Sequence, residues 1–320
     1  MTNQMVDYKA DLNQRYWKYQ KNQFPIWQKF SDRPHTNLVC PPVFDGAGQN
    51  VIVNPNPRQG EIDELFALVP VSDRHKWFRS MNSSQALAQS VLGNLAVNHC
   101  LSSLTELLDD DNRMPLLGMV EASSGNFKME FKIDYLGELP QHPTSLDGYL
   151  GGDYRVAIEC KFTESEVGTC SKPGLKPADS NYCNGNYIRQ KARKERCTLS
   201  EKGALYWKYI PELFDWKSDM DLIPCRLNTN YQLVRNILAV GVKPDGQVSA
   251  ANGHVVLIYD ERNPAFQEGG KGFIAFAETR KALRVPTMLR KCSWQSIIQH
   301  MRNKGIWAWL TEQLELKYGL

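Results

Sequence analysis

The stretch of sequence that decides the expected fold is SLDGYLGGDYRVAIECKFTE, residues 145–164. Its second half predicts a β-strand, because every second residue is apolar and successive side chains of a strand point to opposite faces. The apolar face consists of Val156, Ile158, Cys160 and Phe162. Glu159 and Lys161 share the other face, and a short preceding strand is expected to bring Asp147 beside them. The sequence therefore predicts two carboxylates and an ammonium group close together on one sheet.

Two carboxylates and a lysine are the groups that a Mg²⁺-dependent phosphodiester hydrolase needs. Carboxylate oxygens are the ligands that a hard cation prefers, and a nearby lysine steadies or activates the attacking water. No two histidines have the i, i+4 spacing of a zinc protease, and the chain has neither a G-x-S-x-G motif nor a phosphate loop. These absences exclude the usual patterns of zinc proteases, serine hydrolases and nucleotidases.

The acidic–any–Lys tripeptide alone is a weak signal, because the chain contains several copies. They begin at Asp7, Glu130, Glu159, Asp215 and Glu315. Glu130 is the serious competitor, since residues 127–135 alternate between apolar and polar and predict a half-buried strand. The polar face of that strand is expected to be exposed, so Glu130 is expected to be dispensable for activity. An exposed Glu–Lys pair on an amphipathic strand is the alternative for Glu159, and the order of the flanking elements disfavours it.

The apolar pattern predicts helices and strands in a defined order. The predicted elements are a helix from Ser83, strands over residues 127–135, around Asp147 and over 156–163, an insertion over 164–227, a helix from Thr229, and a strand over 254–259. Thr229 and Gln232 have the spacing of a capping box. Beyond Arg262 the sequence predicts a further strand, Gly272–Ala277, and an apolar C-terminal helix from Trp294.

The composition is that of an ordinary globular protein, with 320 residues of which 42% are hydrophobic and 23% charged. The net charge of +3 gives no global basic signature, so a nucleic-acid surface must come from local clusters. No signal peptide is visible, and no apolar run approaches the length of a membrane span. Eight cysteines without an export signal indicate reduced thiols, and the expected location is the cytoplasm.

Residues 1–30 predict a helix rich in aromatic and basic side chains. Such a helix could stack on bases and meet phosphates. Packing of its aromatic side chains against the body of the protein is the favoured interpretation.

Asp147 followed by Glu159, Cys160 and Lys161, within a helix–three strands–helix–strand frame, resembles the PD-(D/E)XK nuclease superfamily, although Leu146 stands where the motif has proline. Many type II restriction endonucleases belong to this superfamily. The segments SSQALAQSVLGNL, SLDGYL, IECKFTE and YQLVRNIL are similar to a bacterial family of such enzymes. The resemblance implies an α/β fold with this core around a mixed sheet, a long insertion after the catalytic strand, and helical additions at both ends.

The resemblance also implies a division of the chain into three parts. Residues 1–82 form a helical and irregular N-terminal extension, and residues 83–262 form the nuclease core. Residues 263–320 form a C-terminal strand and helix packed on that core. The insertion, residues 164–227, is expected to act as a lid that contacts DNA.

A metal site and a reaction follow from the same resemblance. Asp147 and Glu159 would coordinate Mg²⁺, joined by the backbone carbonyl of Cys160, and Mn²⁺ is expected to substitute for Mg²⁺. Lys161 would lie near the attacking water. The implied substrate is double-stranded DNA, and the implied role is restriction or phage defence. A homodimer is expected if the enzyme cuts both strands of a palindrome.

Two other functions stay open at this stage. One is a nucleic-acid-binding module whose nuclease-like core does not cleave, and the other is the nuclease subunit of a repair or transposition complex. The complete Asp–Glu–Lys set disfavours the first, and a free-standing chain of this length disfavours the second.

Three polar residues on the predicted helices could support the site. Gln232 and Arg235 lie on the first turns of the helix after the insertion, and Gln85 lies on the helix that begins at Ser83. Gln232 could equally serve the capping box, and Gln85 could equally be a first-turn polar residue.

The insertion carries a basic run and a set of cysteines. The basic residues, which are candidates for contact with DNA phosphates, are Arg189, Lys191, Arg193, Lys194 and Arg196. A solvated helix face is their alternative. A zinc or iron–sulfur site on Cys170, Cys183 and Cys197, with Cys225 farther on, stays open. Reduced, partly buried thiols are favoured, because zinc ribbons need closely spaced cysteine pairs.

Overall fold

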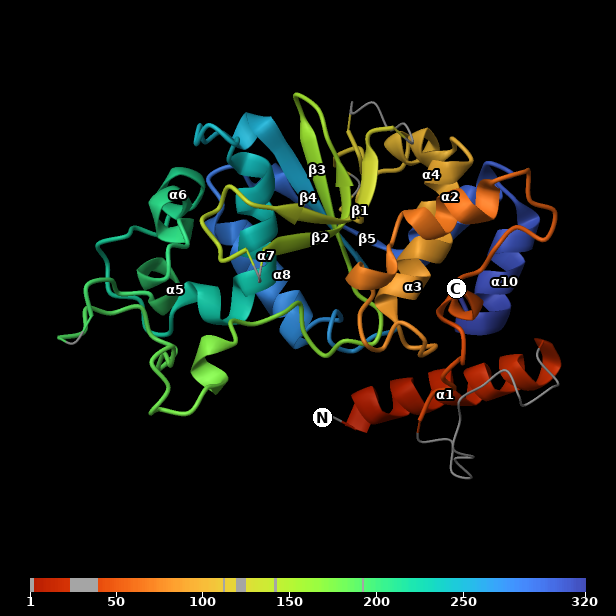
Figure 1. Cartoon of the computed structure of the whole chain (residues 1–320), viewed down its shortest axis with the longest axis horizontal. Coiled ribbons are helices and arrows are strands. Elements are labelled where there is room, and N and C mark those ends of the chain that lie inside the picture. Colours follow the sequence, from red (N-terminus) through yellow and green to blue (C-terminus); the bar gives the residue numbers. More distant parts are fainter. Residues whose placement is uncertain (1–2, 24–39, 112, 119–124, 141–142, 192) are drawn as a thin grey trace.

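The computed structural model describes residues 3–23, 40–111, 113–118, 125–140, 143–191 and 193–320. Its centre is one five-stranded mixed sheet with the strands in sequence order (Figure 1). The strands are β1 (Phe127–Ile133), β2 (Thr144–Leu150), β3 (Arg155–Cys160), β4 (Gly253–Tyr259) and β5 (Leu289–Ser293). Strands β1, β2 and β3 pair antiparallel, whereas β3, β4 and β5 pair parallel.

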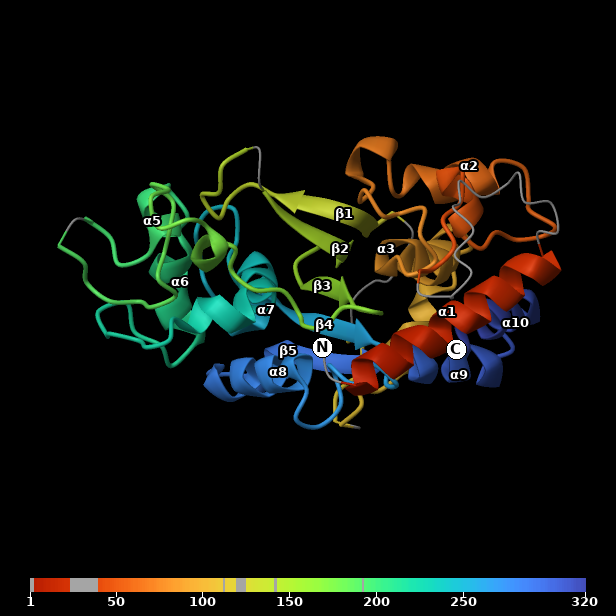
Figure 2. The same cartoon turned by 90° about the horizontal axis from the view of Figure 1, so that it is seen from below.

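Helices surround this sheet on several sides. They are α1 (Asn3–Gln23), α2 (Glu61–Ala67), α3 (Ser84–Ala88), α4 (Asn94–Val97), α5 (Thr198–Glu201), α6 (Tyr206–Leu213), α7 (Arg226–Gly241), α8 (Lys271–Ala282), α9 (Trp294–Asn303) and α10 (Ala308–Tyr318). Both views place α5 and α6 of the insertion at one end of the molecule and α1, α2 and α10 at the other, with the sheet between them (Figures 1 and 2). Among the described residues, no helix has the length and apolar character that crossing a membrane requires.

The predicted order of helix, three strands, insertion, helix and strand is confirmed by the elements from α3 to β4. Ser83 caps α3 as expected, because its side chain accepts a hydrogen bond from the Ala86 N–H. The capping box at Thr229 and Gln232 is wrong. Helix α7 already begins at Arg226, so both residues lie within the helix.

The C-terminal part differs from the prediction in two elements. The predicted strand Gly272–Ala277 is wrong, because these residues belong to helix α8. The buried positions of α8 are spaced by three or four residues, namely Gly272, Ala275, Phe276 and Thr279. Strand β5 was not predicted, since its sequence LRKCS carries two basic residues. Arg290 is nevertheless buried there, and its guanidinium donates to the backbone carbonyls of Pro115 and Thr287.

The centre of the sheet is buried. Every residue of β3 and β4 is buried, which matches the nearly continuous apolar sequences of parallel strands covered on both faces. Helix α7 packs over β2, β3 and β4. Arg155 at the start of β3 ties α7 to the sheet by donating to the carbonyl of Val242 at 2.7 Å. The strand that carries Glu159 is therefore held rigidly.

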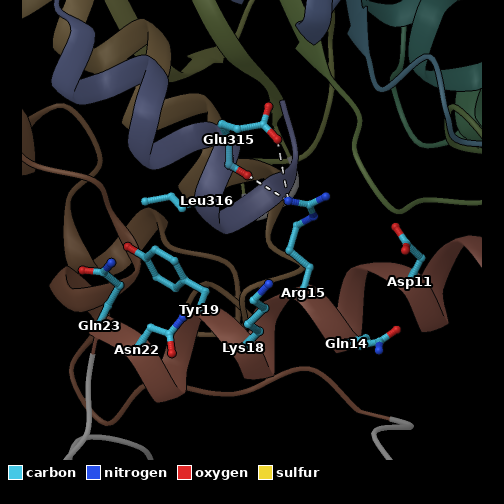
Figure 3. Close-up of a pocket in the computed structure, with 9 residues that line it drawn as sticks. All are labelled: Asp11, Gln14, Arg15, Lys18, Tyr19, Asn22, Gln23, Glu315 and Leu316. Atoms are coloured by element: carbon cyan, nitrogen blue, oxygen red, sulfur yellow. Dashed lines mark hydrogen bonds and ion pairs between the residues drawn. The ribbon is translucent and has the colours of Figure 1, made fainter.

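Helix α1 packs its aromatic side chains against the body of the protein, as favoured from the sequence. Tyr8 Oη donates to Asp260 Oδ2 at 2.9 Å, and the Tyr16 ring meets the Tyr318 ring edge-on with centroids 6.1 Å apart. A shallow hollow of about 310 Å³ lies between α1 and α10, where Arg15 reaches Glu315 (Figure 3). The remaining aromatic and basic residues of the predicted helix, beyond residue 23, lie outside the described residues.

A buried lysine connects the C-terminal helix to the N-terminal part. Lys317 of α10 is 1% exposed, and its Nζ donates to the backbone oxygen of Asn50 at 2.7 Å and to Asn50 Oδ1 at 2.8 Å. Burial lowers the pKa of Lys317 from 10.5 to about 7. The folded state therefore binds this proton less readily than the unfolded chain.

We expect this lysine to make stability depend on pH. Between about pH 7 and pH 10.5 the unfolded chain holds the proton that the folded protein releases, so the free energy of unfolding should rise with pH. The Lys317→Met variant lacks this contribution, and its stability relative to the wild type should fall by about 1.4 kcal/mol per pH unit in that range. Urea unfolding at several pH values measures the difference. The exposed Lys281→Met variant is the control, and a constant difference between Lys317→Met and wild type would contradict the expectation.

Candidate active site

The candidate site is built where β2 and β3 pair. Gly148 and Ile158 are register partners in these antiparallel strands, so Asp147 and Glu159 are opposite each other, one position farther along. Asp147 Oδ2 accepts a hydrogen bond of 2.7 Å from the Cys160 N–H. The structure thus places Asp147 beside the strand that carries Glu159 and leads to Lys161, as the sequence predicts.

Lys161 lies directly against Glu159. Its Nζ is 2.5 Å from Glu159 Oε1, and the side chains are only 14% and 3% exposed. Strand β3 ends at Cys160, and the backbone carbonyl of the next residue, Lys161, accepts a hydrogen bond from the indole N–H of Trp294 at 3.0 Å. An ion pair this well shielded from water is screened little by salt.

Helix α7 fixes the second oxygen of Glu159. Gln232 Nε2 and Asn236 Nδ2 donate to Glu159 Oε2 at 3.1 and 2.6 Å. Gly168 has a φ of +116°, and its carbonyl accepts the Gln232 N–H, so the start of the insertion passes close to this helix. Gln232 therefore supports the site rather than a capping box.

Glu130 also belongs to this cluster, contrary to the expectation of an exposed face. By the register of β1 and β2 it lies opposite Asp147. Its backbone has a φ of +49°, a left-handed conformation that is rare for a non-glycine residue inside a strand. Its carboxylate accepts hydrogen bonds from Gln85 Nε2 at 2.6 Å and from Ser145 Oγ at 3.1 Å. The reason for treating Glu130 as dispensable no longer holds.

Crowding of these acids alters their ionisation. Burial, reinforced by the neighbouring carboxylates of Glu159 and Glu130, raises the pKa of Asp147 well above its ordinary value. Burial also raises the pKa of Glu130. Burial alone would lower the pKa of Lys161, but the surrounding carboxylates, Glu159 first, outweigh it and raise that pKa. Lys161 is therefore a permanent ammonium at neutral pH.

A cleft of about 810 Å³ lies beside the partners of the acid cluster, although Asp147, Glu159 and Glu130 are not among its lining residues. Lys161 and Gln85 line it, together with Glu164 and the exposed rings of His75 and Trp77. Glu164 is held in place by Ser84 Oγ at 2.6 Å and by the Phe162 N–H at 2.5 Å. The lysine therefore faces open space, whereas Glu159 is enclosed by protein.

Arg235 lies near the cluster but is directed to another acid. It pairs with Glu138 at 3.1 Å, and its Nε donates to Thr144 Oγ1 at 3.1 Å. Gln85 reaches the cluster only through Glu130. Of the three supporting residues named from the sequence, Gln232 alone touches Glu159.

The basic run of the insertion divides into two groups. Arg193 donates to Thr198 Oγ1 and to the Tyr182 carbonyl, and Arg196 pairs with Asp221 at 3.5 Å. These two side chains hold the insertion together. The side chains exposed to solvent are those of Arg189, Lys191 and Lys194.

The donor chemistry of the acid cluster fits a hard divalent cation. In the described parts of the chain, no group of three or more His, Cys, Asp or Glu side chains is closed around a metal position. The carboxylates of Asp147, Glu159 and Glu130 nevertheless lie on adjacent strands, and burial, with their mutual repulsion adding to it, raises the pKa of Asp147. A cation bound by carboxylate oxygens would relieve that repulsion.

Two residues of the site escaped the sequence reasoning. Asn236 lies one helical turn after Gln232 on a helix whose buried positions are mostly apolar, so a polar pair at i and i+4 was its available signal. Glu130 had a strand position and an acidic–any–Lys tripeptide. What the sequence lacked was the register that sets it opposite Asp147.

These features define a mixed α/β protein whose central strands carry a buried acid–lysine cluster beside a cleft. A family model described as Restriction Endonuclease associating with ARP matches residues 9–319, and the chain belongs to this restriction endonuclease family. The resemblance to restriction endonucleases drawn from the sequence is thereby confirmed. No curated protein and no solved structure matches the chain.

The crowded carboxylates predict that Asp147→Asn stabilises the fold. A raised pKa means that the ionised carboxylate of Asp147 destabilises the folded state at any pH above its ordinary value of 3.8. Asparagine removes the charge and keeps an oxygen for the Cys160 N–H. We expect the variant to be more stable than the wild type at pH 8 without divalent cations, and this difference to disappear near pH 4.

Thermal unfolding at the two pH values measures this effect. The exposed Asp153→Asn variant, one strand-end away, is the matched control and should unfold like the wild type. An Asp147→Asn protein that is less stable than the wild type at pH 8 would argue against repulsion within the cluster.

Proposed function

We propose that this chain is a Mg²⁺-dependent endonuclease that hydrolyses phosphodiester bonds of double-stranded DNA through a PD-(D/E)XK site, in restriction or phage defence. The observation that carries the proposal is the convergence of Asp147, Glu159 and Lys161 where β2 meets β3. Membership in a restriction endonuclease family supports the same reaction class. The order of elements around the site is also the one expected for that fold.

The roles follow from the surroundings of each residue. Asp147, Glu159 and the backbone carbonyl of Cys160 would hold Mg²⁺ or Mn²⁺, and Glu130 would add a third carboxylate. When bound, the ion polarises the phosphoryl oxygens and lowers the pKa of the attacking water. Cys160 contributes through its backbone, since its N–H already bridges to Asp147 while its thiol points into the core.

Lys161 acts as a fixed positive charge. Its raised pKa keeps it protonated near neutral pH, so it cannot accept a proton from water there. It can orient the water and stabilise the negative charge that develops on the phosphate. Its position at the edge of the cleft gives a backbone phosphate access to it, while Gln232 and Asn236 keep Glu159 from rotating away.

Cleavage of plasmid DNA by the purified chain tests this function. With Mg²⁺ present, the wild type should cut, and Asp147→Asn, Glu159→Gln and Lys161→Met should each lose at least about a hundredfold in rate. Glu130→Gln should also slow cleavage, because it removes a carboxylate opposite Asp147. The exposed Asp134→Asn variant, from the same segment, should cut like the wild type.

Circular dichroism should show that the inactive variants keep the fold, so that loss of activity reports on chemistry. A folded Glu159→Gln protein that cuts at the wild-type rate would refute the site. Full activity of Glu130→Gln would limit the site to the other three residues.

The runner-up is a nuclease that works only within a larger assembly. The description of the family as associating with ARP is the observation that favours it. Absence of cleavage by the purified chain, with Mg²⁺ and Mn²⁺ both tried, would favour this second function or a binding module that does not cleave. Size-exclusion chromatography of the same preparation, with and without DNA, tests the proposed homodimer.

DNA binding by the insertion should depend on the exposed basic residues alone. Replacement of Arg189, Lys191 and Lys194 by glutamine should reduce the slope of log affinity against log salt by about 0.9 for each DNA phosphate that the variant no longer neutralises. Fluorescence anisotropy with labelled duplex DNA, in Ca²⁺ to prevent cutting, measures the slope. The exposed Lys281→Gln variant on α8 is the control, and an unchanged slope for the triple variant would exclude these residues from the interface.

A further inference from the structure

Four cysteines that are far apart in the sequence surround one small pocket in the insertion. Cys170, Cys183, Cys197 and Cys225 all line it, with an otherwise largely apolar wall. Cys197 and Cys225 are buried, whereas Cys170 and Cys183 are half-buried. All eight cysteines of the chain are free thiols in this structure.

Backbone hydrogen bonds tie the cysteine-bearing turns together. The Cys170 N–H donates to the Asn228 carbonyl at 2.9 Å, and the Cys225 N–H donates to the Gly185 carbonyl at 2.8 Å. The Cys183 N–H donates to the Lys172 carbonyl at 3.4 Å. The pocket is therefore framed by the main chain, and the proximity of the thiols does not rest on flexible side chains.

The sulfurs also accept backbone hydrogen bonds in a repeated pattern. The N–H two residues farther along donates to the sulfur of Cys170, of Cys197 and of Cys225. N–H···S bonds of this kind stabilise thiolate charge and orient sulfur ligands in metal centres. Three of the four cysteine turns thus share a hydrogen-bond pattern that also occurs around sulfur ligands in metal centres.

The thiols are close enough to interact electrostatically. Cys225 lies within electrostatic range of Cys197, Cys183 and Cys170. Cys170 likewise interacts with Cys197 and Cys183. Each sulfur therefore has at least two others in its neighbourhood.

The pocket has room for a small occupant. Its volume is about 20 Å³, slightly more than a single water molecule needs. The side chains are not closed around one point, since no described group of three or more potential ligands meets metal geometry. Rotation about χ1 repositions a cysteine sulfur without moving the backbone.

We propose that Cys170, Cys183, Cys197 and Cys225 form a metal centre of four thiolates that ties the insertion together and takes a thiophilic ion, with Zn²⁺ the best match to the pocket. Four sulfur ligands select zinc or an iron–sulfur cluster over magnesium and calcium. The sequence favoured reduced thiols because no two of these cysteines form a close pair. The fold brings the four cysteines together at one pocket although they are far apart in the sequence.

The insertion has little secondary structure, so a metal centre would have a structural role there. In the described part of residues 164–225 the helical segments are short, namely the 3-10 turn Lys172–Gly174, α5 and α6, and α5 and α6 lie at one end of the molecule (Figures 1 and 2). Segments of this size rarely bury enough apolar surface to fold firmly without a metal or disulfides. The centre would supply that cross-link.

Metal analysis of the full chain, purified without oxygen and without added metal, tests the proposal. We expect about one zinc ion per chain, or iron with a similar amount of acid-labile sulfide, and either result supports the thiolate centre. The Cys170→Ser and Cys183→Ser variants should retain less than about a tenth of the metal. Cys100→Ser is the matched control, since Cys100 is half-buried and lies outside the insertion.

A second measurement keeps the test decisive if the serine variants unfold. Alkylation of the wild type before and after metal removal, read by mass spectrometry, should show these four cysteines protected only in the metal-bound form. The proposal is overturned if the wild type contains no zinc or iron and takes up neither Zn²⁺ nor iron with sulfide. It is also overturned if Cys100→Ser loses metal to the same extent as Cys183→Ser.

Discussion

The rest of the structure depends on holding negative charges together on neighbouring strands. Antiparallel pairing sets Asp147 opposite Glu159, and β1 adds Glu130 from the other side. Buried like charges are costly, so this arrangement persists only because the surrounding structure determines it. Lys161 pairs with one oxygen of the Glu159 carboxylate, and the side-chain amides of α7 donate to the other oxygen. Gln85 donates a hydrogen bond to Glu130. A cluster that costs stability in this way is the kind of arrangement expected at a functional site.

Helix α7 connects this cluster to the insertion. It begins directly after Cys225 and has a non-helical residue at Asn230, and the next turns present Gln232 and Asn236 to Glu159. Its remaining length packs on the sheet. The position of the two amides is therefore set from both ends, by the sheet and by the turns that carry the cysteines. A change at the cysteine pocket has a short path to the carboxylate, through the backbone of α7 and the hydrogen bond from Gln232.

The sequence predicted the strands of the site well, because a period of two in the side chains is a local signal. It failed where the deciding information was not local. The apolar run in α8 fits a strand or a helix equally, and only the buried spacing of Gly272, Phe276 and Thr279 distinguishes them. The position of Glu130 opposite Asp147 depends on the register between β1 and β2, which is not a local signal. The four cysteines depended on turns from distant parts of the insertion, which no spacing rule describes.

The basic residues of the insertion connect the stability of this segment to its exposed, positively charged surface. Arg193 and Arg196 come just before Cys197 and contact Tyr182, Thr198 and Asp221 within the insertion. The same turn therefore fixes Cys197 at the pocket and turns Lys194 outward between the two arginines. Loosening the pocket would release the backbone that presents the exposed cations, whose contacts with phosphates need a defined spacing. On this argument the proposed thiolate centre and the proposed DNA-contacting surface of the insertion form one unit, in which the exposed cations would meet the phosphates.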